Sequence, residues 1–154
     1  MKGQKLLEVR AIENGTVIDH IPADSLFKVI SILDLDKADK NTITFGTNLK
    51  SSKLGLKAII KISNKYFEQD DINRIALVAP EAKLNIIKGF TVIEKKKVEI
   101  PDEIRTIVKC MNPMCITNND KVTTKFRVIS KNKIALKCHY CEKITDNEHL
   151  EIIH

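Results

Sequence analysis

Residues 110–141 read CMNPMCITNNDKVTTKFRVISKNKIALKCHYC and contain every cysteine of the 154-residue chain. Cys110 and Cys115 are separated by four residues, Cys138 and Cys141 by two, and 22 residues lie between the two pairs. Two close pairs joined by a segment of β-hairpin length can direct four sulfurs at one point, as a tetrahedral zinc site requires. Four sulfur ligands leave no open coordination position, so the sequence predicts one structural zinc ion.

Other uses of these cysteines fit the sequence less well. Two disulfides could form in three pairings, but nothing in the sequence indicates secretion, and cytosolic thiols stay reduced. A thioredoxin-like redox motif at Cys138–Cys141 would have to open a helix, and no helix is predicted there. His139 and His149 could replace a sulfur ligand, although four cysteines already suffice.

The segment around the cysteines predicts a small all-β domain, of zinc-ribbon or rubredoxin-like type, over residues 99–154. Its expected strands are short and lie near residues 104–109, 122–130, 134–137 and 150–153. A domain of this size has too small an apolar core to be stable by itself. The predicted metal would supply the missing stability.

Residues 1–98 show alternating strand and helix patterns and predict an α+β domain. The expected strands are residues 6–12, 42–49, 56–63, 83–88 and 90–95. The apolar spacing of Leu26, Val29 and Leu33 predicts a helix that starts near Asp24 or Ser25. A second helix is expected at residues 69–78, before Pro80. This order is that of a ferredoxin-like βαββαβ sandwich with a closing strand.

The net charge of +6 is concentrated in the N-terminal domain. Residues 1–98 hold 17 Lys and Arg against 12 Asp and Glu, a net +5, whereas residues 99–154 hold 9 against 8. Four thiolates and one divalent zinc ion would bring the smaller domain to −1. No apolar run approaches the roughly 18 residues that span a bilayer, and residues 1–7 lack the apolar core of a signal peptide. The sequence therefore predicts a cytoplasmic protein with no membrane partner.

Two sets of polar residues in the N-terminal domain are candidates for function. Asp19 and His20 are adjacent, but neighbours in an extended segment point to opposite faces, which favours a structural role over acid–base catalysis. Lys57 and Lys61 alternate with apolar residues, and three lysines occupy residues 95–97. They form either a solvated face or a site for a phosphorylated small molecule. Periodicity alone leaves both possibilities open.

Four stretches of sequence resemble a known family. They are Gly15–Pro22 (GTVIDHIP), Leu77–Pro80 together with Asn85, Ile134–Cys138 (IALKC) and Tyr140–Lys143 (YCEK). In these stretches and in its cysteine spacing, the whole chain resembles the regulatory chain of aspartate carbamoyltransferase. The resemblance implies a non-catalytic subunit of pyrimidine biosynthesis, with a dimerising, nucleotide-binding domain at residues 1–98. The zinc domain at residues 99–154 would contact the catalytic chain.

The resemblance also implies an effector site and an interface. In the family, cytidine triphosphate (CTP) inhibits and adenosine triphosphate (ATP) activates, and three regulatory dimers link two catalytic trimers. The base and ribose pocket would be lined by Val9, Ala11, Ile12, Asn85, Ile87, Phe90 and Val92. Asp19 and Lys61 would face the ribose, and His20 and Lys95 the phosphates. Asn112, Glu142 and Lys143 would contact the catalytic chain.

Two other classes of function are weaker alternatives. A zinc-ribbon nucleic-acid-binding protein should carry a basic, aromatic-rich surface on the zinc domain, but that domain is nearly neutral and its only aromatic residues are Phe126 and Tyr140. A free-standing enzyme would need an open metal position, or a nucleophile with a base and an orienting group. The sequence shows none of these.

Overall fold

The computed structural model describes residues 11–37 and 40–153. The chain divides into two compact units, Met1–Val98 and Glu99–His154. In the described residues, each unit contains its own antiparallel sheet and its own set of fully buried side chains.

The first unit has the predicted α+β order. Within residues 11–37 and 40–98 the elements are β1 (Gly15–Pro22), α1 (Leu26–Ile32), β2 (Ile43–Ser51), β3 (Gly55–Ser63), α2 (Gln69–Asn73), β4 (Lys83–Lys88) and β5 (Thr91–Lys97). Short 3₁₀ turns precede α1 at Ala23–Ser25 and extend α2 at Arg74–Leu77. The sheet order is β2-β3-β1-β4-β5, and every neighbouring pair is antiparallel. This is the ferredoxin-like arrangement with one added edge strand, so the predicted fold class is confirmed.

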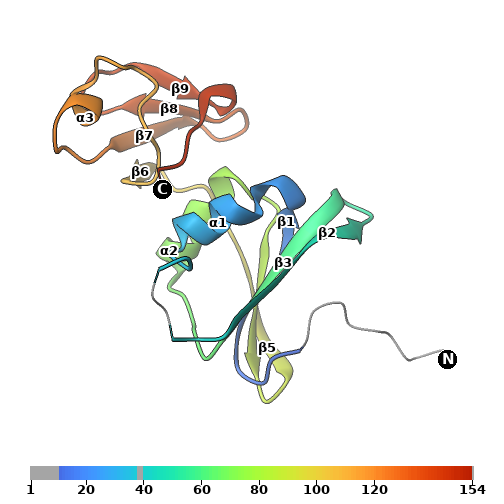
Figure 1. Ribbon diagram of the computed structural model, residues 1–154. Helices are drawn as coiled ribbons and strands as arrows, with labels where there is room; N and C mark the ends of the chain where they lie inside the picture. The colour runs from blue at the N-terminus through green and yellow to red at the C-terminus, as the bar shows by residue number, and fades with distance from the viewer. Residues whose placement is uncertain (1–10, 38–39, 154) are drawn as a thin grey trace. The chain divides into compact units, whose positions relative to one another are not determined.

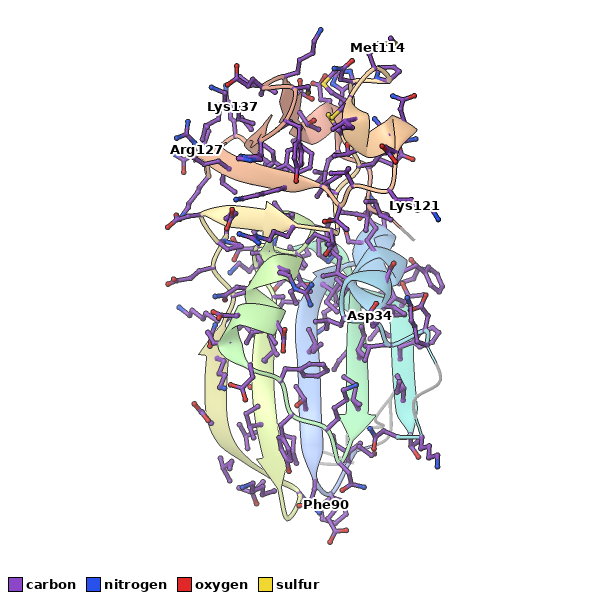
Figure 2. The ribbon with its side chains drawn as sticks, turned by 90° about the vertical axis from the view of Figure 1, so that its left-hand side faces the viewer. Asp34, Phe90, Met114, Lys121, Arg127 and Lys137 are labelled. Carbon is purple, nitrogen blue, oxygen red and sulfur yellow. The ribbon has the colours of Figure 1, made fainter. Side chains whose placement is uncertain are left out.

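Both helices lie on the same face of this sheet (Figures 1 and 2). Helix α1 buries Leu26, Val29 and Ile32, which follow its 3.6-residue period. The sheet presents Ile18, Ile60 and Leu84 to the core, and each is 0% exposed. Because strand side chains alternate, the residues next to these in sequence lie on the opposite face, which neither helix covers. We call this the helix-free face.

Two glycine positions fix the geometry of the sheet. Gly15 begins β1 at φ +139°, and a Cβ there would come within 2.0 Å of the Ile62 carbonyl oxygen on β3. A larger residue would therefore separate the two strands. Gly89 and Phe90 form the two-residue turn between β4 and β5, with φ of 57° and 64°. Two positive φ values are typical of a type I′ hairpin turn, which glycine adopts without strain and phenylalanine does not.

The predicted strand at residues 6–12 lies mostly outside the described residues. Residues 6–10 lie outside the described residues, and residues 11 and 12 belong to no strand. Among the described residues, the first strand of the βαββαβ order is β1, which pairs with both β3 and β4. This strand supplies Ile18 and Ile21, both 0% exposed, to the core.

In the second unit, four short strands form a sheet in the order β6-β7-β8-β9 across the described residues 99–153. They are β6 (Glu103–Arg105), β7 (Lys125–Ser130), β8 (Ala135–Cys138) and β9 (Ile144–Asp146), with the one-turn helix α3 (Ile116–Asn119) between β6 and β7 and a 3₁₀ turn at Asn147–His149. Ile104, Phe126 and Leu136 form the core. The prediction of an all-β domain is confirmed apart from α3.

The fourth strand was predicted in the wrong place. Residues 150–153 contribute only an isolated bridge, between Ile152 and Val108. The chain turns back directly after Cys138, whose N–H donates to the Lys143 carbonyl at 3.0 Å, so the next residues already lie beside β8. Strand β9 therefore begins at Ile144.

Candidate functional site

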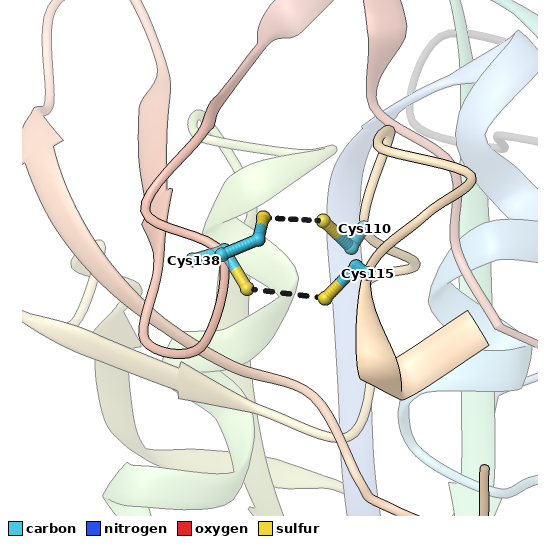
Figure 3. Close-up of side chains that lie close together, drawn as sticks. Cys110, Cys115 and Cys138 are labelled. Carbon is cyan, nitrogen blue, oxygen red and sulfur yellow. Dashed lines mark hydrogen bonds between the residues drawn. The ribbon is translucent and has the colours of Figure 1, made fainter. Parts of the chain in front are cut away.

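The four cysteines come together as a compact cluster in the second unit. Their sulfur atoms all lie within 4.8 Å of one another. The Cys110–Cys141 sulfurs are 3.6 Å apart and the Cys115–Cys138 sulfurs 3.7 Å apart, and Figure 3 shows both contacts as dashed lines. These separations are far longer than a disulfide bond of about 2.05 Å. They match the spacing of about 3.8 Å between sulfurs that surround a metal at about 2.3 Å in a tetrahedron.

The first pair is held by a loop that polar side chains brace. The Asn118 amide donates to the carbonyl oxygens of Cys110 at 2.9 Å and of Asn112 at 2.8 Å. The Cys115 N–H donates to the Asn112 carbonyl at 3.0 Å, and Cys115 is the N-cap of α3. The Thr117 hydroxyl donates to the Cys115 sulfur at 3.2 Å. These contacts orient the Cys110 and Cys115 sulfurs toward the other pair, as hydrogen bonds around metal ligands do.

The second pair sits on a tight turn at the end of β8. Cys138 is the last residue of the strand and pairs with Phe126 of β7. The Glu142 N–H donates to the Cys138 carbonyl at 3.0 Å, and Glu142 has φ of 63°. The turn therefore points the Cys138 and Cys141 sulfurs to the same side.

Burial opposes the ionisation of the thiols in this cluster. Burial raises the pKa of the Cys110 thiol from 9.0 to about 12, and it also raises the pKa of Cys138. Burial acts in the same direction on Cys141, but hydrogen bonds from the Lys143 N–H and the Asn112 side chain outweigh it and lower that pKa to about 7. Four thiolates in so small a space repel one another unless a cation lies between them. The donor set and its geometry thus fit a thiolate-binding metal.

The two candidate histidines have other neighbours. The His149 ring nitrogen Nδ1 lies 2.6 Å from the Asp146 carboxylate, and the His139 ring packs edge-to-face against Tyr140. Among the described residues, the metal-ligand cluster contains cysteines only.

In the first unit, predicted nucleotide-site residues form a row across the helix-free face. Lys61 of β3 pairs with Val17 of β1, Val17 pairs with Asn85 of β4, and Asn85 pairs with Lys95 of β5. Directly paired residues point to the same side of a sheet. Lys61 is only 9% exposed, and burial lowers its pKa, although the nearby Asp19 carboxylate acts in the opposite direction. In this row the Asn85 carboxamide lies between the buried Lys61 on one side and the exposed Lys95 on the other.

Asp19 and His20 lie at a bulge in β1, where the pairing register with β3 shifts between Ile18 and Ile21. His20 has φ of 60°, its N–H donates to Asp19 Oδ1 at 2.6 Å, and its Nδ1 lies 3.8 Å from the same oxygen. The expectation that the two side chains point to opposite faces is therefore wrong, because the bulge interrupts strand alternation. Lys57 Nζ forms an ion pair with Asp19 Oδ1 at 3.0 Å.

The remaining predicted residues lie toward the β4–β5 turn. Ile87 pairs with Val92 on the helix-free face, two residues from the row on β4. Phe90 occupies the turn itself and is exposed at the end of the sheet (Figure 2). Its N–H donates to the Glu13 carbonyl at 2.9 Å, which ties the turn to the segment that follows Ala11 and Ile12. Val9 lies outside the described residues.

Comparisons with known proteins agree with this two-part architecture. Residues 7–99 match the family "Aspartate carbamoyltransferase regulatory chain, allosteric domain", and residues 102–151 match "Aspartate carbamoyltransferase regulatory chain, metal binding domain". The chain belongs to the aspartate carbamoyltransferase regulatory chain family. As a member of this family it is a regulatory, non-catalytic chain with an allosteric domain and a metal-binding domain.

Relatives described as aspartate carbamoyltransferase regulatory chains match over nearly the full length. The chain is 53% identical to that of Bacteroides fragilis over 152 residues, which cover 99% of each chain. It is 54% identical to that of Parabacteroides distasonis over 149 residues, 97% of this chain and 96% of the relative. Identity to that of Thermococcus sibiricus is also 54%, over 139 residues that cover 90% and 91%. The recognition of the regulatory-chain family from sequence motifs is confirmed.

The sequence analysis did not identify some residues on the helix-free face and around the cysteine cluster. Lys83 pairs with both Asp19 and Lys97, which places two further cations on the helix-free face. The spacing of two between Lys83 and Asn85 could have revealed this. Thr117 and Asn118 brace the metal loop through α3, and no periodic pattern announces a helix of a single turn.

None of the helices in the described part of the chain is long and apolar enough to cross a membrane.

Proposed function

We propose that this chain is the allosteric subunit that carries nucleotide control to aspartate carbamoyltransferase. Residues 1–98 bind a nucleoside triphosphate, CTP or ATP, and residues 99–154 hold one structural zinc ion and contact the catalytic chain. The observation that carries the nucleotide part is the row of Lys61, Asn85 and Lys95 on the helix-free face.

The helix-free face has a polarity that suits a nucleotide. Ile87 and Val92 form an apolar pair near the β4–β5 turn. The row of Lys61, Asn85 and Lys95 crosses the sheet two residues earlier on β4. On β1, Asp19 lies two residues after Val17, the member of that row on this strand, and His20 follows Asp19. Two such steps span about 13 Å, comparable to an extended nucleoside triphosphate. The base packs on Ile87 and Val92. His20 and Lys95 donate charge-assisted hydrogen bonds to the phosphates.

The proposed metal is zinc because the ligands are four thiolates. Soft sulfur ligands in tetrahedral geometry favour zinc among the common divalent ions, and a closed Cys₄ site has no position for a substrate. The role of the ion is to stabilise a domain whose core is small. The loop of Cys110 and Cys115 and the turn of Cys138 and Cys141 are distant in sequence, and binding the same ion joins them into one unit.

Exposed apolar side chains support two protein partners. Met114 is 84% exposed, and Met111 and Ile116 beside it are also exposed, so the first metal loop presents an apolar surface for the catalytic chain. In the first unit, Phe27 of α1 and Phe45 of the edge strand β2 form an exposed edge-to-face pair with ring centroids 6.1 Å apart. A second regulatory chain covers this pair and the β2 edge in a homodimer.

The decisive experiment reconstitutes the full-length chain with the catalytic chain of its source. Saturation curves for aspartate are recorded without nucleotide and with CTP or ATP. We expect a regulatory-chain-dependent shift of the curve by at least one nucleotide, and binding of that nucleotide to the isolated regulatory chain by calorimetry. If neither nucleotide binds and neither moves the curve, the proposed function is wrong.

A further inference from the structure

The outer face of the second unit's sheet contains a cavity of about 530 Å³. Strands β6, β7 and β8 line it together with the turn that follows Cys138. A single row of paired residues crosses the sheet here: Glu103, Arg127, Lys137 and Ile144. Their sequence neighbours Ile104, Phe126, Leu136 and Thr145 are buried in the core, so the row lies on the outer side.

Three of the charged side chains that line this cavity, Asp102, Glu103 and Lys125, have ion-pair partners within the chain. Glu103 accepts from Arg105 at 3.2 Å and forms an ion pair with Lys125 at 3.3 Å. Asp102 forms an ion pair with Lys131 at 2.8 Å. The pKa values of both carboxyl groups are lowered: that of Asp102 mainly by its hydrogen bond to Lys131, that of Glu103 by Lys125 and Arg105, which outweigh desolvation.

Arg127 and Lys137 are the two lysine or arginine side chains in the lining that lack such a partner among the described residues. They are directly opposed across β7 and β8, and they lie close together in Figure 2. Among residues 11–37 and 40–153, no acidic side chain forms an ion pair with either of them. Glu142, on the turn that follows Cys138, also lines the cavity. Like charges directly opposite each other destabilise an antiparallel pair, and an anion between them would remove that cost.

We propose that Arg127 and Lys137 receive a carboxylate side chain of the catalytic chain. Arginine can hold the carboxylate through two parallel N–H donors, and the lysine adds a third contact as a point charge. Ile144, which pairs with Lys137, is 49% exposed and lies at the end of the row. An apolar side chain beside two cations fits a protein surface with an acidic residue better than it fits a small, fully polar anion.

The location supports the same partner. The cavity is lined by Glu142, one of the residues for which the family resemblance implies contact with the catalytic chain. The inference therefore rests on the proposed function and adds a definite recognition chemistry to it. Unpaired cations of this kind steer an acidic partner and fix its orientation.

The test compares two full-length double variants that each remove two positive charges. R127Q/K137Q changes the cavity, and K121Q/K133Q changes two exposed lysines outside it. Association with the catalytic chain is measured by sedimentation at several salt concentrations, and metal content confirms that each variant is folded. We expect R127Q/K137Q to weaken association about tenfold to a hundredfold at low salt, with a smaller salt dependence than wild type. K121Q/K133Q should remain within about twofold.

The charge-conserving variant R127K/K137R adds a check and should retain most of the affinity. If R127Q/K137Q associates as tightly as K121Q/K133Q, the inference is wrong while the proposed function stands. If wild-type chain does not associate at all, both are wrong. A succinate titration of the regulatory chain alone gives the last outcome: submillimolar binding that R127Q/K137Q abolishes would make the cavity a small-molecule site and overturn docking.

Discussion

Replacing Lys95 by alanine tests whether the helix-free face binds nucleotide. Lys95 pairs with Asn85 on that face, whereas its neighbour Lys96 pairs with Leu84, whose side chain is 0% exposed in the core under the helices. Lys95→Ala and Lys96→Ala thus remove the same charge from adjacent positions but from opposite faces of one strand. The chain itself provides the matched control.

The two variants differ in expected magnitude. A hydrogen bond from an ammonium group to a phosphate contributes about 1.5–3 kcal/mol, so Lys95→Ala should weaken nucleotide binding about tenfold to a hundredfold. A charge on the opposite face, roughly 10 Å from the phosphates, interacts in water by about 0.4 kcal/mol before salt screening. Lys96→Ala should therefore lose about twofold or less.

Calorimetric titration of the full-length chain with CTP and with ATP measures both effects. Repeating it at higher salt should remove what little Lys96→Ala loses, because screening acts on the distant charge, and should leave most of the Lys95→Ala effect. Equal losses in the two variants would refute the reasoning. The lysines would then contribute only a general positive potential, and the nucleotide would bind elsewhere.

Three further predictions concern the second unit. Cys138→Ser should abolish stoichiometric metal in elemental analysis and unfold this unit, while calorimetry still finds nucleotide binding to the first. Thr145 is 0% exposed, and its hydroxyl has no hydrogen-bond partner among the described residues, so Thr145→Val should stabilise the metal-loaded protein against urea by about 1 kcal/mol. The Asp146 carboxylate raises the pKa of His149 above 6.5, and His149 in turn lowers that of Asp146 below 3.8. Their pair stabilises the fold between those limits; its contribution is lost as pH rises through the raised pKa of His149 or falls through the lowered pKa of Asp146. An NMR titration of Asp146→Asn should show a lower His149 pKa, and an unchanged one would exclude the pairing.

Local patterns were sufficient where each residue's role depends on its near neighbours. The helix at Leu26–Ile32, the strands at residues 43–51 and 55–63 and the β4–β5 hairpin all followed from apolar period and turn residues. The cysteine pairs likewise indicated a metal site, because ligand spacing within a loop is a local property. Local patterns failed at residues 150–153, which contribute only an isolated bridge between Ile152 and Val108. Pairing with a partner strand decides the outcome there.

The sequence by itself determined the α+β class, the set of four cysteines as candidate ligands and the motifs that resemble the regulatory-chain family. Only the tertiary structure decided which side chains share a face. Lys61, Asn85 and Lys95 come from three strands, and strand pairing places them in one row. Arg127 and Lys137, ten residues apart, become opposed cations through the β7–β8 register. The bulge at His20 turned its side chain toward Asp19, against the alternation that a regular strand would impose. The physical reason is the same in each case: the register of hydrogen bonds between strands is set by which faces the whole core can bury, and no single segment contains that information.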